Sequence, residues 1–241
     1  MSSFFRFKQF SICHDQCAMK VNTDGVLLGA WVRVDAAHSQ RVLDVGTGSG
    51  LIAIMLAQRC PSAQIDAVEL DESSCRQAVQ NAASCPWSER LHMVCADFNI
   101  FAQQADMRYD LIVSNPPYFS QSLCSPDVQR NAVRHNLSLE HDDLVMRSKN
   151  LLTPQGRLAL VLPYVEGSVL VAHAATFGLY CCRKLNVSTK KGRPPKRLLL
   201  ELSAERQPCD EQDFFIENEA LNSYTEAYKI LTGDFYLNFF R

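Results

Sequence analysis

From residue 41 onward the sequence alternates between short apolar runs and helical patterns, and this alternation restricts the chain to an α/β fold. Apolar runs that predict strands cover 41–45, 64–69, 91–95, 110–114, 157–162, 179–187 and 197–202. Helical patterns separate most of these runs, which is typical of a parallel sheet with right-handed crossovers. No helix intervenes between the last two runs, so they predict an antiparallel hairpin. We therefore expect a mostly parallel seven-stranded sheet with an antiparallel edge hairpin and helices on both faces.

Composition agrees with a globular protein and narrows its environment. The chain has 241 residues, enough for a full core, and 47% of them are hydrophobic. No apolar run approaches the ~20 residues of a membrane helix, and the start lacks the apolar region of an export signal. The 10 cysteines are scattered and form no Cys-x-x-Cys pair, so we expect neither a zinc site nor a disulfide framework. These features favour a reducing cytoplasm and predict no metal.

The first predicted strand leads into a glycine-rich turn that contains Gly46, Gly48 and Gly50. Glycine allows positive φ and lets the backbone approach a ligand closely. A dinucleotide fingerprint would need its third glycine at Leu51, so the spacing departs from that pattern. Asp44 precedes the turn and would repel a pyrophosphate, but it suits a positively charged ligand. S-adenosylmethionine carries a sulfonium and an ammonium and has no phosphate.

Acids also follow the next two predicted strands. Glu69 ends the second strand, where a carboxylate can accept both hydroxyls of a ribose. Asp97 follows the third strand and can accept from an adenine amino group. With their neighbours Leu70 and Phe98, these acids complete a candidate S-adenosylmethionine site. A glycine turn and two acids in this order resemble the class I S-adenosylmethionine-dependent methyltransferases over roughly residues 41–202, which implies a Rossmann-like sheet.

The fourth predicted strand ends in Asn115-Pro116-Pro117-Tyr118. Two prolines stop the strand, because neither has a backbone N–H. A simple Pro-Pro turn with Tyr118 in the core is one interpretation. The other is that the tetrapeptide resembles the methyltransferase signature for methylating an amino nitrogen conjugated to a planar ring. The Asn115 side-chain oxygen and the Pro116 carbonyl would then accept the amine N–H groups, and Tyr118 would stack on the base.

Flanking segments extend the resemblance nearly end to end. They are Lys20 to Trp31, the corner through Phe119 followed by Arg130, Arg134 and His135, and Tyr224-Thr225-Glu226 to Phe235-Tyr236-Leu237. These segments are similar to the bacterial tRNA1(Val) (adenine(37)-N6)-methyltransferase family. The resemblance implies N6 methylation of adenine 37 beside the anticodon of tRNA1(Val). It also implies that Thr23 and Asp24 lie near the methionine part of the cofactor, although both could simply begin a helix as an N-cap.

An RNA substrate requires local basic patches, because the net charge of −2 gives no global nucleic-acid signal. One predicted patch surrounds the hairpin loop, and a second follows the Asn-Pro-Pro-Tyr corner. The candidate RNA contacts are Arg130, Arg134, Lys190, Lys191, Arg193 and Lys196. Lys184, Arg197 and His135 lie beside them. Such charge runs are also typical of solvated faces.

Two other functions share parts of this pattern. An enzyme with the same corner could methylate an rRNA guanine or a protein glutamine, and a non-catalytic RNA-binding protein could retain the fold. For the chain as a whole we expect a monomer with no membrane contact. We divide it into a lead-in packing on the cofactor site (1–34), a methyltransferase domain (35–205) and a C-terminal extension packing on that domain (206–241).

Overall fold

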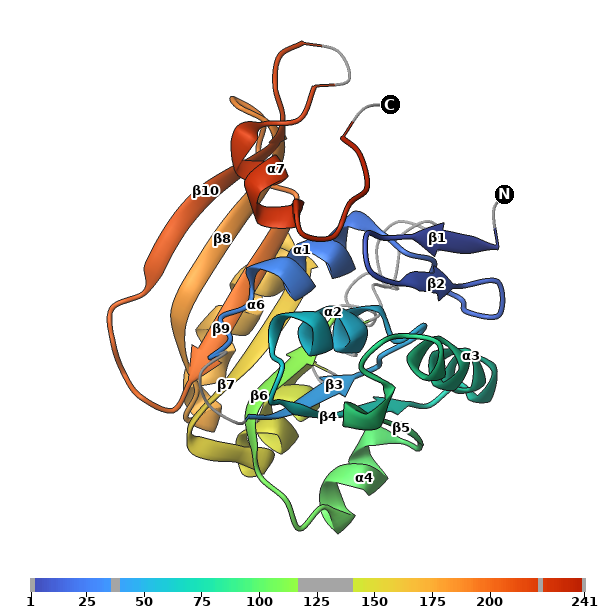
Figure 1. The fold of residues 1–241 in the computed structure, drawn as a ribbon. Coiled ribbons are helices and arrows are strands. Elements are labelled where there is room, and N and C mark those ends of the chain that lie inside the picture. The colour runs from blue at the N-terminus through green and yellow to red at the C-terminus, as the bar shows by residue number, and fades with distance from the viewer. Residues whose placement is uncertain (1–2, 36–39, 117–140, 221–222, 240–241) are drawn as a thin grey trace, which may run out of the picture.

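In the computed structural model, which describes residues 3–35, 40–116, 141–220 and 223–239, eight strands form one sheet (Figure 1). Its order is β10-β8-β9-β7-β6-β3-β4-β5. The strands are β3 (Arg41–Val45), β4 (Gln64–Glu69), β5 (Leu91–Cys95), β6 (Tyr109–Ser114), β7 (Leu152–Pro163), β8 (Tyr180–Lys190), β9 (Arg197–Ser203) and β10 (Asp210–Glu217). Within this sheet only β9 runs antiparallel to its neighbours. The predicted α/β class and mostly parallel sheet are confirmed.

The expected count of seven strands and the edge position of the hairpin are corrected by β10. This strand pairs in parallel with β8 and covers what would have been the edge of the sheet. Its first four residues, Asp210 to Asp213, are polar and exposed, and Phe214 is its buried residue. A strand with so little apolar alternation gives a weak period-two signal, so the sequence did not reveal it.

Helices cover both faces of the sheet. One layer contains α1 (Thr23–Trp31), α2 (Leu51–Arg59), α3 (Glu72–Ala83) and α7 (Glu226–Thr232), and the other contains α4 (Phe98–Gln104), the helix over 141–151 and α6 (Tyr164–Ala174). Short 3-10 turns lie at Ser88–Arg90 and Ala175–Phe177. Alternate residues of β6 serve the two layers, because Leu111 and Val113 pack in the first core and Ile112 in the second.

The two ends of the described chain meet beside this first layer (Figure 1). An antiparallel hairpin of β1 (Phe4–Arg6) and β2 (Ser11–Cys13) begins the chain. The Phe7 ring stacks near Tyr236 with centroids 5.9 Å apart, and the Lys8 amide donates to the Phe235 carbonyl at 2.8 Å. The three-part division of the chain remains a prediction. Within the described ranges, no helix is both long and apolar enough to cross a bilayer.

Candidate active site

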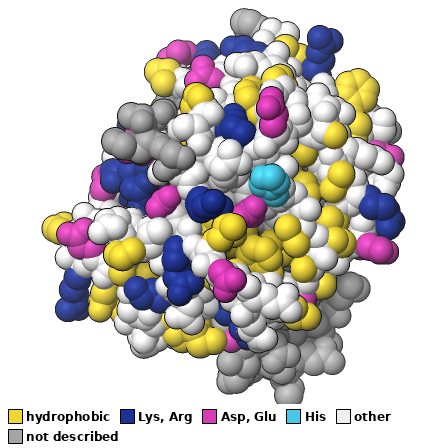
Figure 2. Space-filling view, turned by 60° about the horizontal axis from the view of Figure 1, so that its bottom comes forward, with side chains coloured by type: hydrophobic (Ala, Val, Ile, Leu, Met, Phe, Trp, Pro, Cys, Tyr) yellow, Lys and Arg dark blue, Asp and Glu magenta, His cyan; other side chains and the backbone are white. Residues whose placement is uncertain are grey.

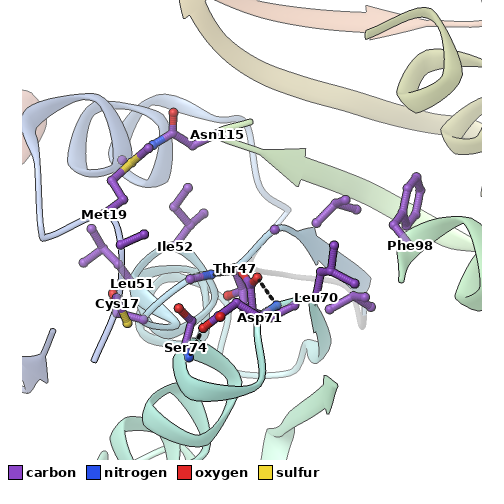
Figure 3. Close-up of a pocket in the computed structure, with 18 of the residues that line it drawn as sticks. Cys17, Met19, Thr47, Leu51, Ile52, Leu70, Asp71, Ser74, Phe98 and Asn115 are labelled. Carbon is purple, nitrogen blue, oxygen red and sulfur yellow. Dashed lines mark hydrogen bonds between the residues drawn. The ribbon is translucent and has the colours of Figure 1, made fainter. Parts of the chain in front are cut away.

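A cavity of about 500 Å³ lies at the carboxyl ends of β3, β4, β5 and β6 (Figure 3). Ligands of open α/β sheets bind at this edge. The cavity brings together the predicted residues Gly46, Gly48, Glu69, Leu70, Asp97, Phe98 and Asn115. Four strand ends that are far apart in the sequence therefore supply one site, which we call the main cavity.

The glycine turn presents bare backbone to the main cavity. Gly46 and Gly48 have φ values of 69° and 57°, in the left-handed region that favours glycine. A Cβ added at either residue would meet nothing within 4 Å, so the space beside both is open. At Gly50, an added Cβ would make ordinary contact with Ala78 at 3.6 Å, so its φ of 82°, and not a lack of space, favours glycine there. The turn can thus cradle a ligand through two of its three predicted glycines.

Asp44 lies beneath the turn and does not line the main cavity. Its carboxylate is fully buried and accepts from the Thr47 hydroxyl at 2.6 Å and the Ala53 amide at 3.1 Å. Ala53 is in the first turn of α2, whose N-cap Gly50 has no side chain, so Asp44 supplies the missing cap. Burial raises the pKa of Asp44 to about 7, although both hydrogen bonds lower it.

Glu69 joins two loops at the wall of the main cavity. One carboxylate oxygen accepts from the Gly48 amide at 2.8 Å and the other from the Asp71 amide at 2.9 Å. Each carboxylate oxygen can accept more than one hydrogen bond, so both retain capacity for a ligand hydroxyl. Asp97 is the N-cap of α4, and its side chain accepts from the Asn99 amide at 2.6 Å.

The N-terminal segment also lines the main cavity, in particular through Cys17, Ala18 and Met19. Two buried amides of α3 hold this segment. Gln77 accepts from the Gln16 amide at 2.9 Å and donates to Asp15 at 2.8 Å. Asn81 exchanges hydrogen bonds with the Cys13 backbone and also donates to the Ser49 carbonyl at 2.8 Å.

Asn115 lies at the end of β6, half-buried, with Pro116 buried behind it. Its amide nitrogen donates to the thioether sulfur of Met19 at 3.7 Å, and in Figure 3 its oxygen points away from Met19. The contact with Met19 therefore engages the amide nitrogen. The predicted stacking residue Tyr118 lies outside the described residues.

Thr23 and Asp24 line a second pocket, of about 220 Å³, instead of the main cavity. The Asp24 carboxylate pairs with Arg197 at 2.7 Å. Their neighbours Asn22 and Gly25 do line the main cavity, and Asn22 caps α1 by accepting from the Gly25 amide at 2.9 Å. The first turn of α1 thus separates the two pockets, and the capping role belongs to Asn22.

Several cavity residues were missed from the sequence, among them Cys17, Met19, Asn22 and Ser74. A signal existed in α3, where Ser74, Gln77 and Asn81 repeat at helical spacing and are all buried. Buried polar side chains on one helix face need partners, so this stripe indicates a docked segment.

The basic hairpin loop lies at the same sheet edge as the main cavity, because Arg197 at the start of β9 pairs with Pro163 at the end of β7. Lys191, Arg193 and Lys196 are exposed, and Lys190 is half-buried. Lys184 instead pairs with Glu211 at 2.8 Å. On the face seen in Figure 2, Lys and Arg side chains stand among Asp and Glu, in keeping with the net charge of −2. Arg130, Arg134 and His135 lie outside the described residues.

Across the described ranges, no group of three or more His, Cys, Asp or Glu side chains could hold a metal ion. The absence of a metal remains a prediction for the whole chain.

Comparison with known proteins points to one family. The family described as "Methyltransferase small domain" matches residues 24–168. The tRNA1(Val) (adenine(37)-N6)-methyltransferase of Bacteroides fragilis (strain YCH46) is 47% identical, over 97% of this chain and 98% of its own. The enzyme of the same name from Histophilus somni (strain 2336) is 44% identical, over 98% of each chain.

Solved structures support the fold alone. A predicted O-methyltransferase, protein Atu636 from Agrobacterium tumefaciens, has a TM-score of 0.65 at 18% identity, covering 88% of this chain and 96% of its own. TrmN from Thermus thermophilus has a TM-score of 0.51 at 20% identity, covering 77% of this chain and 54% of its own. The shared architecture is that of methyltransferases.

Proposed function

Because this chain belongs to the methyltransferase small domain family and, within it, to the tRNA1(Val) (adenine(37)-N6)-methyltransferases, we propose that it methylates N6 of adenine 37 beside the anticodon of tRNA1(Val). The methyl donor is S-adenosylmethionine. The observation that carries this proposal is the single cavity that runs from the glycine turn to Asn115. This cavity joins a glycine turn that can hold the cofactor to Asn115, whose side-chain oxygen can accept a hydrogen bond from an amine.

The residues of the main cavity fit S-adenosylmethionine. The space beside Gly46 and Gly48 is open, so a ligand can contact the backbone there directly. A side chain at either position would occupy part of that space. The Glu69 oxygens can accept from ribose hydroxyls, and Asp97 can accept from the adenine amine. Leu70 and Phe98 line the same end and offer apolar surface to the adenine ring. When bound, the cofactor supplies an electrophilic methyl group on a positively charged sulfur.

Asn115 and Pro116 would orient the substrate amine. The lone pair of an exocyclic adenine amine is delocalised into the ring, so the nitrogen is a poor nucleophile. Hydrogen bonds from its two N–H groups to the Asn115 oxygen and the Pro116 carbonyl would localise that lone pair and aim it at the methyl carbon. Orientation and electrostatics of this kind need no strong general base. Tyr118 would stack on the base.

The remaining expectations about the molecule belong to the same proposal. We infer a cytoplasmic monomer that requires no metal and meets tRNA through Lys190, Lys191, Arg193 and Lys196, with Arg130 and Arg134 beyond the corner. We retain neither of the alternative substrates, rRNA guanine and protein glutamine, because the relatives named above are tRNA adenine methyltransferases.

An assay with defined RNA tests the proposed reaction. The purified protein should transfer label from S-adenosylmethionine to a tRNA1(Val) transcript with adenosine at position 37. A matched transcript with guanosine at that position should take up none. Equal labelling of both transcripts would refute the proposed target.

A further inference from the structure

The second pocket is lined by residues that the proposed chemistry does not use. It is bordered by the start of α1, the ends of β8 and β10, the start of β9, and α7. We call it the tyrosine pocket, after Tyr224 and Tyr228 in its wall. It lies at the carboxyl edge of the sheet, separated from the main cavity by the first turn of α1.

An aromatic platform forms one side of the tyrosine pocket. The rings of Tyr224 and Tyr228 stack with centroids 4.9 Å apart and an angle of 24°. Tyr228 is only 3% exposed and fixes the half-buried Tyr224 from below. A supported ring that lines an open pocket is the type of surface on which an unpaired base stacks.

Polar residues line the same pocket as this platform. Thr23 and Ser188 carry hydroxyl groups and Glu217 carries a carboxylate. The ion pair between Asp24 and Arg197, at 2.7 Å, is part of the same wall. Donors and acceptors beside an aromatic face are how proteins bind single-stranded bases.

Positive charge approaches the tyrosine pocket from the hairpin loop. Lys196 lines the pocket and is exposed, and Lys191 and Arg193 precede it in the loop. Lysine and arginine side chains of this kind neutralise backbone phosphates. An aromatic platform with basic residues at its rim matches a nucleotide better than a neutral metabolite.

The tyrosine pocket is also close enough to Asn115 to share one RNA strand with it. Ser114 pairs with Leu160 on β7, and Pro163 of β7 pairs with Arg197 at the start of β9. Two strand spacings and two residues of rise separate Asn115 from Arg197, which is roughly 12 Å. A neighbouring nucleotide of the same strand can cover that distance.

We propose that the tyrosine pocket holds the base of a nucleotide that neighbours the target adenine in the single-stranded anticodon loop. The inference rests on the proposed function and assigns Thr23 and Asp24 to the RNA subsite instead of the cofactor. Tyr224 stacks on the base, and the basic loop contacts the adjoining phosphate.

The test pairs protein variants with RNA lacking single bases. Tyr224→Leu keeps apolar volume but removes the ring, and should raise KM for an anticodon stem-loop RNA about tenfold. The kcat at saturating RNA and the Kd for S-adenosylmethionine should stay at wild-type values, and Tyr224→Phe should restore KM. Tyr180→Leu is the matched control, because Tyr180 is a half-buried residue at the far end of β8.

Abasic RNAs, tested with both wild type and Tyr224→Leu, then locate the base. Removing one base near the target should raise KM by a similar factor, and that RNA should bind Tyr224→Leu no worse than wild type. The inference is overturned if no abasic position near the target raises KM, or if the Tyr224→Leu effect persists with every abasic RNA. If wild type fails to methylate the intact RNA, the proposed function fails first.

Discussion

At the scale of single residues, Asp44 and Glu69 are both acids at the ends of strands, yet their surroundings give them different tasks. Asp44 is fully buried and caps α2 from beneath the glycine turn. Glu69 is half-buried in the cavity wall and binds two backbone amides through separate oxygens. Glu69 is therefore accessible to a ligand in the main cavity, whereas Asp44 is enclosed and has a structural role.

Glu69→Ala should weaken binding of S-adenosylmethionine about tenfold or more, because a charged acceptor for the ribose is lost. Isothermal titration calorimetry measures the Kd directly. Glu72→Ala is the matched control, since Glu72 is exposed in the first turn of α3. An unchanged Kd for Glu69→Ala would remove this residue from the cofactor site.

Asp44 should make the stability of the protein depend on pH. Burial raises its pKa from 3.8 to about 7, so the folded chain keeps a proton that the unfolded chain releases. The free energy of unfolding contributed by Asp44 therefore falls as pH rises from about 4 to about 7, by at most about 1.4 kcal/mol per pH unit.

Asp44→Asn should remove that dependence. Urea unfolding at about pH 5 and about pH 7.5 would give wild type a larger loss of stability than the variant across this interval. The same loss in both proteins would mean that Asp44 ionises at its ordinary pKa in the folded state.

The sequence distinguished these two acids only in part. Position at a strand end could be predicted for both, because the apolar runs were clear. The burial of Asp44 could not be predicted, since it depends on how α2 packs over the turn. Likewise Thr23 and Asp24 belong to a different pocket from Asn22 and Gly25, although all four are consecutive in the chain.

At the scale of elements, α3 acts as the dock for the N-terminal segment. Gln77 and Asn81 are one helical turn apart and both buried. Together they bind the backbone of residues 13 and 16 and the Ser49 carbonyl beside the glycine turn. The helix thereby links the lead-in wall of the main cavity to the cradle.

Gln77→Ala should weaken binding of S-adenosylmethionine roughly tenfold without touching the cavity, because the segment carrying Cys17 and Met19 loses its anchor. Hydrogen exchange should speed up over residues 13–20. Gln80→Ala, an exposed glutamine of the same helix, should change neither quantity. Wild-type affinity and exchange in Gln77→Ala would contradict the docking role.

Strongly periodic elements were predictable, and weakly apolar ones were not. The bounds of β3, β4 and β5 follow from their apolar runs, and Asp71 caps α3 as its sequence indicates. By contrast, α4 and β10 carry few buried residues, so local periodicity gave no sign of them.

At the scale of the whole molecule, the position of the basic residues matters more for RNA binding than the net charge of the chain. The net charge is −2, but the hairpin register brings Lys191, Arg193 and Lys196 to the edge that holds the main cavity.

Contacts between the two chain ends could not be predicted from the sequence, because they depend on tertiary packing, which local patterns do not encode. The identification of tRNA as the substrate rests on motif resemblance and family membership, since no local sequence rule specifies one tRNA.

Charge reversal at Lys191 and Arg193 to Glu should raise KM for tRNA about tenfold and reduce the salt dependence of binding, because phosphate contacts are lost. Steady-state kinetics at several salt concentrations measures both. The same reversal at Arg108 and Arg206 is the control, because both are exposed at the opposite edge of the sheet, where Arg108 precedes β6 and Arg206 lies over Tyr180 at the start of β8. Equal KM values in the two double variants would mean that the hairpin loop does not contact tRNA.

Mass spectrometry of nuclease fragments and nucleosides from tRNA1(Val) treated with enzyme and S-adenosylmethionine tests the central claim most directly, because the nucleosides identify the modification and the fragments give its position. Wild type should produce N6-methyladenosine at position 37. Asn115→Ala should produce at least about a hundredfold less while binding the cofactor with wild-type affinity, because the oriented acceptor for the amine is gone. Methylation at another nucleoside, or near-normal product from Asn115→Ala, would contradict the account.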